Sequence, residues 1–86
     1  MAFSESEIKN LLEFLERKYP KGYDSVDSLK KVIPPQINPN QLFENLVFCL
    51  DEHYVDATPI KTDQEGIVDL HNIKITSSGI RFLRKF

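Results

Sequence analysis

The sequence predicts a small α+β domain in which three helices form a core and are followed by a β-hairpin and a short closing helix. Three observations predict this order. Apolar residues recur at helical spacing in segments up to Tyr54, strand-like alternation follows between Val55 and Ile75, and a Thr-x-x-Gly segment begins at Thr76. A chain of 86 residues buries only roughly 60% of the surface that its unfolded form exposes, so we expect one core and one domain over residues 1–86.

The first helix is predicted to begin at Ser4. Ser4 and Glu7 have the spacing of a capping box, and Phe3 and Ile8 stand at the positions of a hydrophobic staple. Apolar residues then recur on one helical face until Pro20 interrupts the pattern. This face consists of Ile8, Leu11, Leu12, Leu15 and Tyr19.

The second and third helices are each predicted from a cap. Asp24 or Ser25 caps a short second helix that ends before Pro34. Asn38 is expected to cap the third helix, with Gln41 reaching back toward the cap. The expected buried stripe of the third helix is Leu42, Phe43, Leu46, Val47, Leu50 and Tyr54.

The remainder of the chain is predicted to form the hairpin and the closing helix. Residues 58–60 favour an extended segment, and residues 63–66 favour a turn in which glycine adopts a positive φ. The alternation changes phase at residues 71–72, which predicts a bulge or a break. Thr76 or Ser77 then caps the last helix.

Composition excludes several classes of protein. Cys49 is the single cysteine, so an internal disulfide is excluded. No segment has the length and apolarity of a membrane span, and the N-terminus lacks the pattern of a signal peptide, so we expect no membrane association and a cytoplasmic location. The formal net charge of −2 neither favours nor excludes nucleic acid, because a local patch matters more than the sum.

The order of elements and the ending Ile75-Thr76-x-x-Gly79-x-x-Phe82-Leu83 resemble small bacterial or phage winged-helix proteins. The resemblance covers nearly the whole chain. It implies that the third helix is a recognition helix and that the hairpin is a wing, which contacts the minor groove or phosphates.

The first functional hypothesis is therefore a non-enzymatic regulator that binds double-stranded DNA. Gln41 and Asn45, expected on the solvent side of the third helix, would contact bases. Basic side chains would contact phosphates, and the candidates are Lys61, Lys74, Arg81, Arg84 and Lys85.

The second hypothesis is a protein-interaction or dimerisation module. Between Asn40 and Asp56 the chain has four acidic residues and no Lys or Arg, which opposes contact with a polyanion. Phe48 is expected among the polar residues on the solvent side of this helix, and Phe14 and Phe82 lie off the main apolar stripes of their helices. Because aromatics are enriched in interface cores, the expected interface consists of Phe14, Glu44, Phe48, Glu52 and Phe82.

An enzyme is not expected. Cys49 and His53 have metal-ligand spacing, but His71 would have to join them, and a structural zinc site needs four ligands. The sequence shows no orienting third group for a Cys-His nucleophile and no glycine-rich phosphate loop. We therefore expect no catalytic residue, no metal, no cofactor and no small-molecule substrate.

Overall fold

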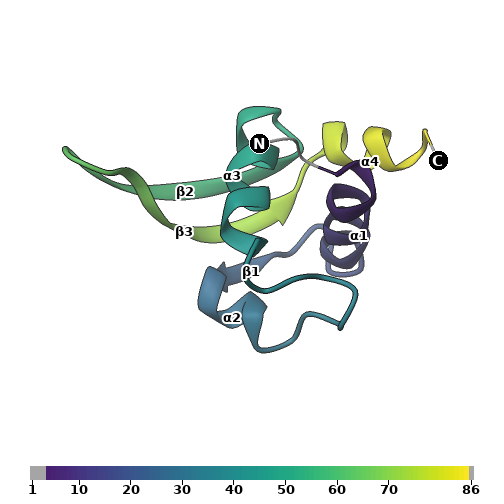
Figure 1. The fold of residues 1–86 in the computed structure, drawn as a ribbon. Helices are drawn as coiled ribbons and strands as arrows, with labels where there is room; N and C mark the ends of the chain where they lie inside the picture. Colours follow the sequence, from purple (N-terminus) through teal and green to yellow (C-terminus); the bar gives the residue numbers. More distant parts are fainter. Residues whose placement is uncertain (1–3, 86) are drawn as a thin grey trace.

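The structure, a computed structural model, describes residues 4–85. Four helices and three strands follow one another in the described residues (Figure 1). They are α1 (Glu5–Glu16), β1 (Tyr23–Ser25), α2 (Val26–Lys30), α3 (Leu42–Asp51), β2 (Val55–Thr62), β3 (Gly66–Ile75) and α4 (Ser77–Leu83). The predicted α+β class, the hairpin and the short closing helix are confirmed.

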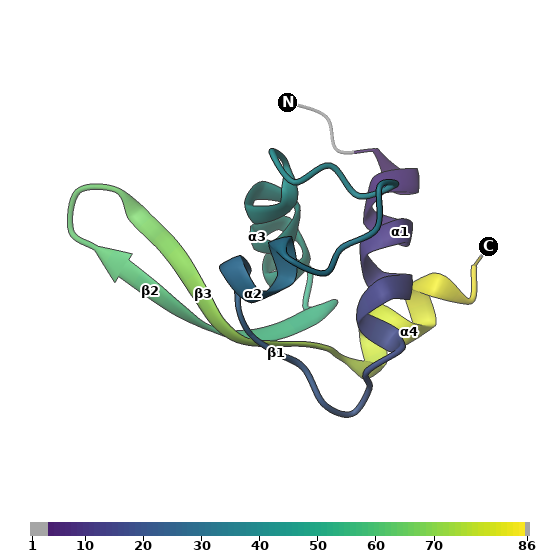
Figure 2. The same cartoon turned by 90° about the horizontal axis from the view of Figure 1, so that it is seen from below.

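The strands form one antiparallel sheet in the order β1-β3-β2. Helices α2 and α3 lie on one side of this sheet, and α4 packs beside α1 (Figure 2). The β2–β3 hairpin extends away from the helices and makes the molecule longest in that direction (Figure 1). Strand β1 was not predicted, since three residues are too few to show an alternating pattern.

The first two helices begin at the expected residues, with one difference in how they are capped. The α1 helix starts after Ser4, whose carbonyl accepts the Ile8 N–H at 3.1 Å, but the Ser4 side chain makes no capping hydrogen bond. The predicted staple partner Phe3 lies outside the described residues. The α2 helix is capped by Ser25, whose Oγ accepts the Ser28 N–H at 3.2 Å.

The α3 helix begins at Leu42, three residues later than the Asn38 cap predicts. Asn38 instead closes a turn, in which its Oδ1 accepts the Asn40 N–H at 2.9 Å. Gln41 then occupies the N-cap position. The buried side of the helix also differs from the expected stripe and consists of Leu42, Asn45, Leu46 and Cys49.

The hairpin turn and the phase change in β3 are both confirmed. Gly66 has a φ of 73° at the end of the turn, and Asn72 has a φ of 56° within β3. Asp56 pairs with Lys74 and Thr58 with His71, so β3 carries one extra residue between these pairs. This bulge allows Leu70 and Ile73, which are three residues apart, both to be fully buried.

The Thr-x-x-Gly segment joins α4 to the end of α3. Thr76 Oγ1 accepts the Gly79 N–H at 3.1 Å and donates to the His53 carbonyl at 2.5 Å. A Cβ at Gly79 would overlap the Tyr54 carbonyl oxygen, so only glycine allows this close approach. The motif is therefore explained by capping and packing.

One hydrophobic core holds these elements together. Its buried residues include Ile8, Leu11, Leu12, Leu15, Leu29, Leu42, Leu46, Val55, Leu70, Ile73 and Ile75. Among residues 4–85, no helix has the length and apolarity needed to cross a membrane.

Candidate interaction surfaces

The outward side of α3 carries carboxylates and no cation. Glu44 and Asp51 are exposed, as is Glu52 at the end of the helix, and Leu42–Asp51 contains no Lys or Arg. Side chains three or four positions apart share a helix face, so Val47 lies between Glu44 and Asp51. We define the acidic face of α3 as these carboxylates together with the half-buried apolar residues beside them: Glu44, Asp51, Glu52, Phe43, Val47 and Phe48.

Neither residue expected to contact bases is presented by this face. Asn45 is only 5% exposed, so its expected position on the solvent side is wrong. The helix turns Asn45 inward because Asn45 shares the i, i+3, i+4, i+7 repeat with Leu42 and Leu46. Gln41 is half-buried. In the amide orientation that places its NH₂ group toward acceptors, its nitrogen donates to the two Glu7 carboxylate oxygens at 2.8 and 3.2 Å.

The three phenylalanines of the expected interface have separate surroundings. Phe82 is only 8% exposed and packs on Tyr54, with ring centroids 4.8 Å apart, so it contributes little to the surface. Phe14 is half-buried and stacks on Tyr23 at 5.6 Å. Phe48 is half-buried against the core. Only Phe48, with Glu44 and Glu52, belongs to the acidic face of α3.

The basic candidates do not form one surface. Lys61 lies on the hairpin, whereas Arg81, Arg84 and Lys85 lie on or directly after α4, and the hairpin tip and α4 are at opposite ends of the molecule (Figures 1 and 2). Arg84 lines a hollow between α1 and α4 together with Lys9, Glu13 and Glu16, so cations and carboxylates are mixed there. The remaining candidate, Lys74, is exposed on β3.

Lys74 instead shares a hollow with a residue that sequence reasoning missed. Lys21, in the connection between α1 and β1, lines the same open hollow of about 400 Å³. We call it the Lys21–Lys74 hollow, and its other lining residues are Pro20, Gly22, Tyr23, Asp24 and Asn72. The available signal was the segment Arg17-Lys18-Tyr19-Pro20-Lys21, which has three cations in five positions.

Tyr23 anchors a further cation at the edge of this hollow. The Lys18 ammonium lies 4.3 Å from the centroid of the Tyr23 ring, within the range of a cation–π contact. Burial raises the pKa of Tyr23, and the Arg17 charge opposes that rise. Lys18 therefore lies against the ring that lines the hollow, whereas Arg17 lines a different pocket.

The side chains considered for metal or nucleophilic chemistry do not come together. Cys49 is fully buried, and burial, assisted by the nearby Glu52 charge, raises the pKa of its thiol to about 12. His71 lies 3.3 Å from the Asp69 carboxylate, and His53 is exposed. Within residues 4–85, no group of three or more His, Cys, Asp or Glu side chains is arranged to hold a metal ion.

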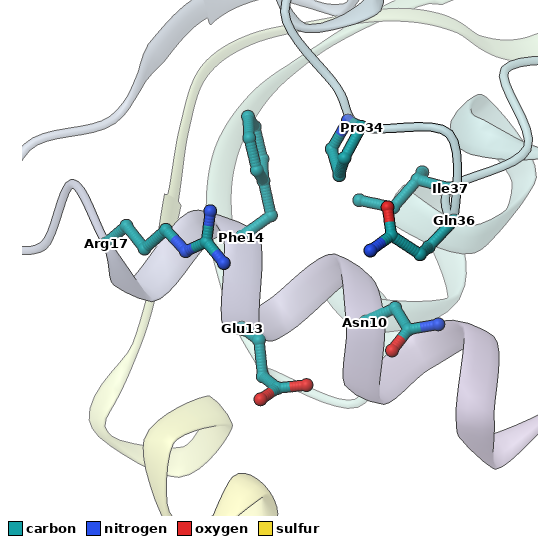
Figure 3. A pocket seen from close by; sticks show the side chains of 7 residues that line it. All are labelled: Asn10, Glu13, Phe14, Arg17, Pro34, Gln36 and Ile37. Carbon is teal, nitrogen blue, oxygen red and sulfur yellow. The ribbon is translucent and has the colours of Figure 1, made fainter.

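A smaller pocket lies between α1 and the connection from α2 to α3. Figure 3 shows the Phe14 ring facing Pro34 and Ile37, with polar groups from Asn10, Glu13, Arg17 and Gln36 around them. Its volume of about 90 Å³ is well below the several hundred Å³ of typical small-molecule sites. The pocket has room for one side chain rather than for a substrate.

Comparisons with protein-family models, curated proteins and solved structures gave no significant match. The functional argument therefore rests on the geometry of this chain.

Proposed function

We propose that the chain is a non-enzymatic winged-helix domain that binds a basic protein segment on the acidic face of α3. The observation that carries the proposal is that exposed Glu44 and Asp51 flank half-buried Val47 on a helix without Lys or Arg. A surface that combines charge with partly exposed apolar side chains is suited to a partner of opposite charge with apolar anchors.

The winged-helix assignment is supported by the order of elements. A short helix α2 precedes α3, the β2–β3 hairpin follows directly, and α4 closes the chain. In this fold α3 is the helix that DNA-binding members present to the major groove. The assignment concerns the fold, and function depends on the side chains that α3 presents.

Those side chains favour protein over DNA. DNA binding depends on the neutralisation of phosphates by cations. The three carboxylates of the acidic face would instead repel the phosphates. Gln41 is engaged with Glu7 and Asn45 is buried, so neither base-reading candidate is available. The same carboxylates would attract a basic partner.

The charge of α3 also disfavours a symmetric dimer through this face. In a twofold dimer the same patch meets its own copy, which would bring Glu44, Asp51 and Glu52 against their counterparts. Like charges across an interface are unfavourable, so we expect a different chain as the partner. The chemistry that fits is a short segment with Lys or Arg beside Leu or Phe.

A selection from a displayed library of short random peptides tests this proposal. We expect the selected peptides to be rich in basic and large apolar residues, and the double variant Glu44→Lys/Asp51→Lys to bind a synthetic selected peptide at least about tenfold more weakly in fluorescence anisotropy. Both positions are exposed, so the fold should persist, which circular dichroism would check.

The matched control makes the same charge change at the hairpin tip. Asp63→Lys/Glu65→Lys should leave peptide affinity within about twofold, because these exposed residues lie in the turn between β2 and β3, away from α3. Selected peptides without basic residues, or equal losses in both double variants, would contradict docking on α3.

Duplex DNA binding remains the second candidate, because the hairpin extends beyond the helices and carries Lys61. This function predicts that a labelled duplex binds at low salt and that Lys61→Glu weakens the complex. If Lys61→Glu leaves a measurable duplex affinity unchanged, the hairpin is not a DNA-contacting wing.

A further inference from the structure

We infer that the hollow between α1 and α4 is the contact surface of a symmetric dimer, in which Arg84 of each copy lies against Glu16 of the other. This α1–α4 hollow has a volume of about 420 Å³ and lies at the end of the molecule opposite the hairpin tip (Figures 1 and 2). It shares no residue with the acidic face of α3. The inference therefore does not rest on the proposed protein-binding function.

The α4 wall of the hollow carries apolar side chains that the fold covers only in part. Ile80 and Leu83 are half-buried, pack against the core and also line the open hollow. Because they are three positions apart on α4, both side chains lie on the same face of the helix. Covering them with another apolar surface would remove further apolar area from water, which is favourable. This wall can therefore supply the apolar centre of a contact.

The charges on the two walls are of opposite sign. On α1, Glu13 pairs with Lys9 at 3.4 Å, which leaves Glu16 as the carboxylate of this wall without a cation beside it. On the α4 side, Arg84 is exposed directly after the helix. Among residues 4–85, neither Glu16 nor Arg84 forms an ion pair, although both line the hollow. Each therefore remains available to an opposite charge from outside the molecule.

This arrangement is self-complementary under twofold symmetry. In a twofold dimer, a residue that contacts a different residue of the copy is contacted by that residue in return. Placing Arg84 of one copy against Glu16 of the other therefore forms two ion pairs, with Ile80 and Leu83 of both copies between them. The acidic face of α3 lacks this property, because its charged residues are all carboxylates. Of the two surfaces, the α1–α4 hollow is the one that fits a second copy.

Sedimentation velocity of charge-exchanged variants tests the dimer. Glu16→Arg would bring like charges together in both ion pairs, and so would Arg84→Glu, so each variant should dimerise at least about tenfold more weakly than the wild type. In an equimolar mixture of the two variants, each altered side chain meets an opposite charge in the other variant. The mixture should therefore form a heterodimer with an affinity within about threefold of the wild-type value. An ion pair within one molecule would not be restored by mixing.

The matched control reverses charges on the hairpin. Lys61→Glu and Glu65→Arg alter exposed residues outside the hollow, and each should leave the dimer affinity within about twofold of the wild-type value. Circular dichroism of each variant separates loss of the fold from loss of the contact. The inference is overturned if the wild type stays monomeric up to about 1 mM, if the mixture of Glu16→Arg and Arg84→Glu does not form a dimer, or if the hairpin variants lose as much affinity.

Discussion

Thr76 contributes to stability through two hydrogen bonds made by one hydroxyl group. Its Oγ1 caps α4 at Gly79 and donates to the His53 carbonyl. Thr76→Ala should therefore lower the free energy of unfolding by about 1–2 kcal/mol, since loss of an N-cap alone costs about 1 kcal/mol. Thr76→Ser keeps the hydroxyl and should remain within about 0.5 kcal/mol of wild type. Urea unfolding measures both, and equal losses in the two variants would contradict the capping role.

The buried Cys49 thiol makes stability depend on pH in the alkaline range. Its pKa is about 12 in the folded protein against 9.0 for the ordinary thiol. Because burial raises the folded-state pKa, the contribution of the neutral thiol to the free energy of unfolding is fully present below about pH 9. It is lost as pH rises toward 12. Across that pH window, the free energy of unfolding of the wild type should fall by up to about 1.4 kcal/mol per pH unit more than that of Cys49→Ala.

Urea unfolding at several pH values checks this prediction. Comparing slopes with Cys49→Ala removes the contributions of tyrosine and lysine groups that titrate in both proteins. Parallel stability curves would show that the thiol ionises equally in the folded and unfolded chains.

At the residue scale, the sequence predicted some caps and turns correctly, whereas Asn38 does not cap α3 and the Ser4 side chain makes no capping hydrogen bond. Ser25, Gly66 and Thr76 act as expected, because each role depends on neighbours within three or four residues. Asn45 was assigned to the wrong side of α3. That side is decided by which elements pack around the helix, and the sequence of the helix alone does not contain this information.

At the scale of the element, the stability of β3 depends on the backbone conformation of its bulge. Asn72 holds a positive φ of 56°, which glycine tolerates and asparagine accepts better than most residues. Asn72→Val should cost about 1–2 kcal/mol, because a β-branched side chain is strained there, whereas Asn72→Gly should be nearly neutral or slightly stabilising. Thermal unfolding of the two variants tests this, and equal melting temperatures would contradict the need for a left-handed residue.

The bulge also shows what local pattern can reveal about a strand. The phase change between Leu70 and Ile73 is visible in the sequence because both residues are apolar and lie three apart. Strand β1 left no such sign, since its three residues become a strand only by pairing with β3. The Lys21–Lys74 hollow was hidden for the same reason, because that pairing creates it.

At the scale of the whole molecule, the net charge of −2 does not show how the charges are distributed. Carboxylates gather on α3, whereas cations are spread over the hairpin, α4 and the Lys21–Lys74 hollow. In our account α3 binds a basic protein segment. The resemblance to winged-helix proteins suggested DNA reading by the third helix, and the charges and contacts of α3 favour protein docking instead.

The most direct test is to map amide chemical-shift changes by ¹H–¹⁵N NMR while a selected basic peptide is titrated at low salt. The account predicts changes along α3 (Leu42–Asp51), with the amides of the turn between β2 and β3 unaffected. Changes concentrated away from α3 would contradict docking of a basic segment on the acidic face of α3.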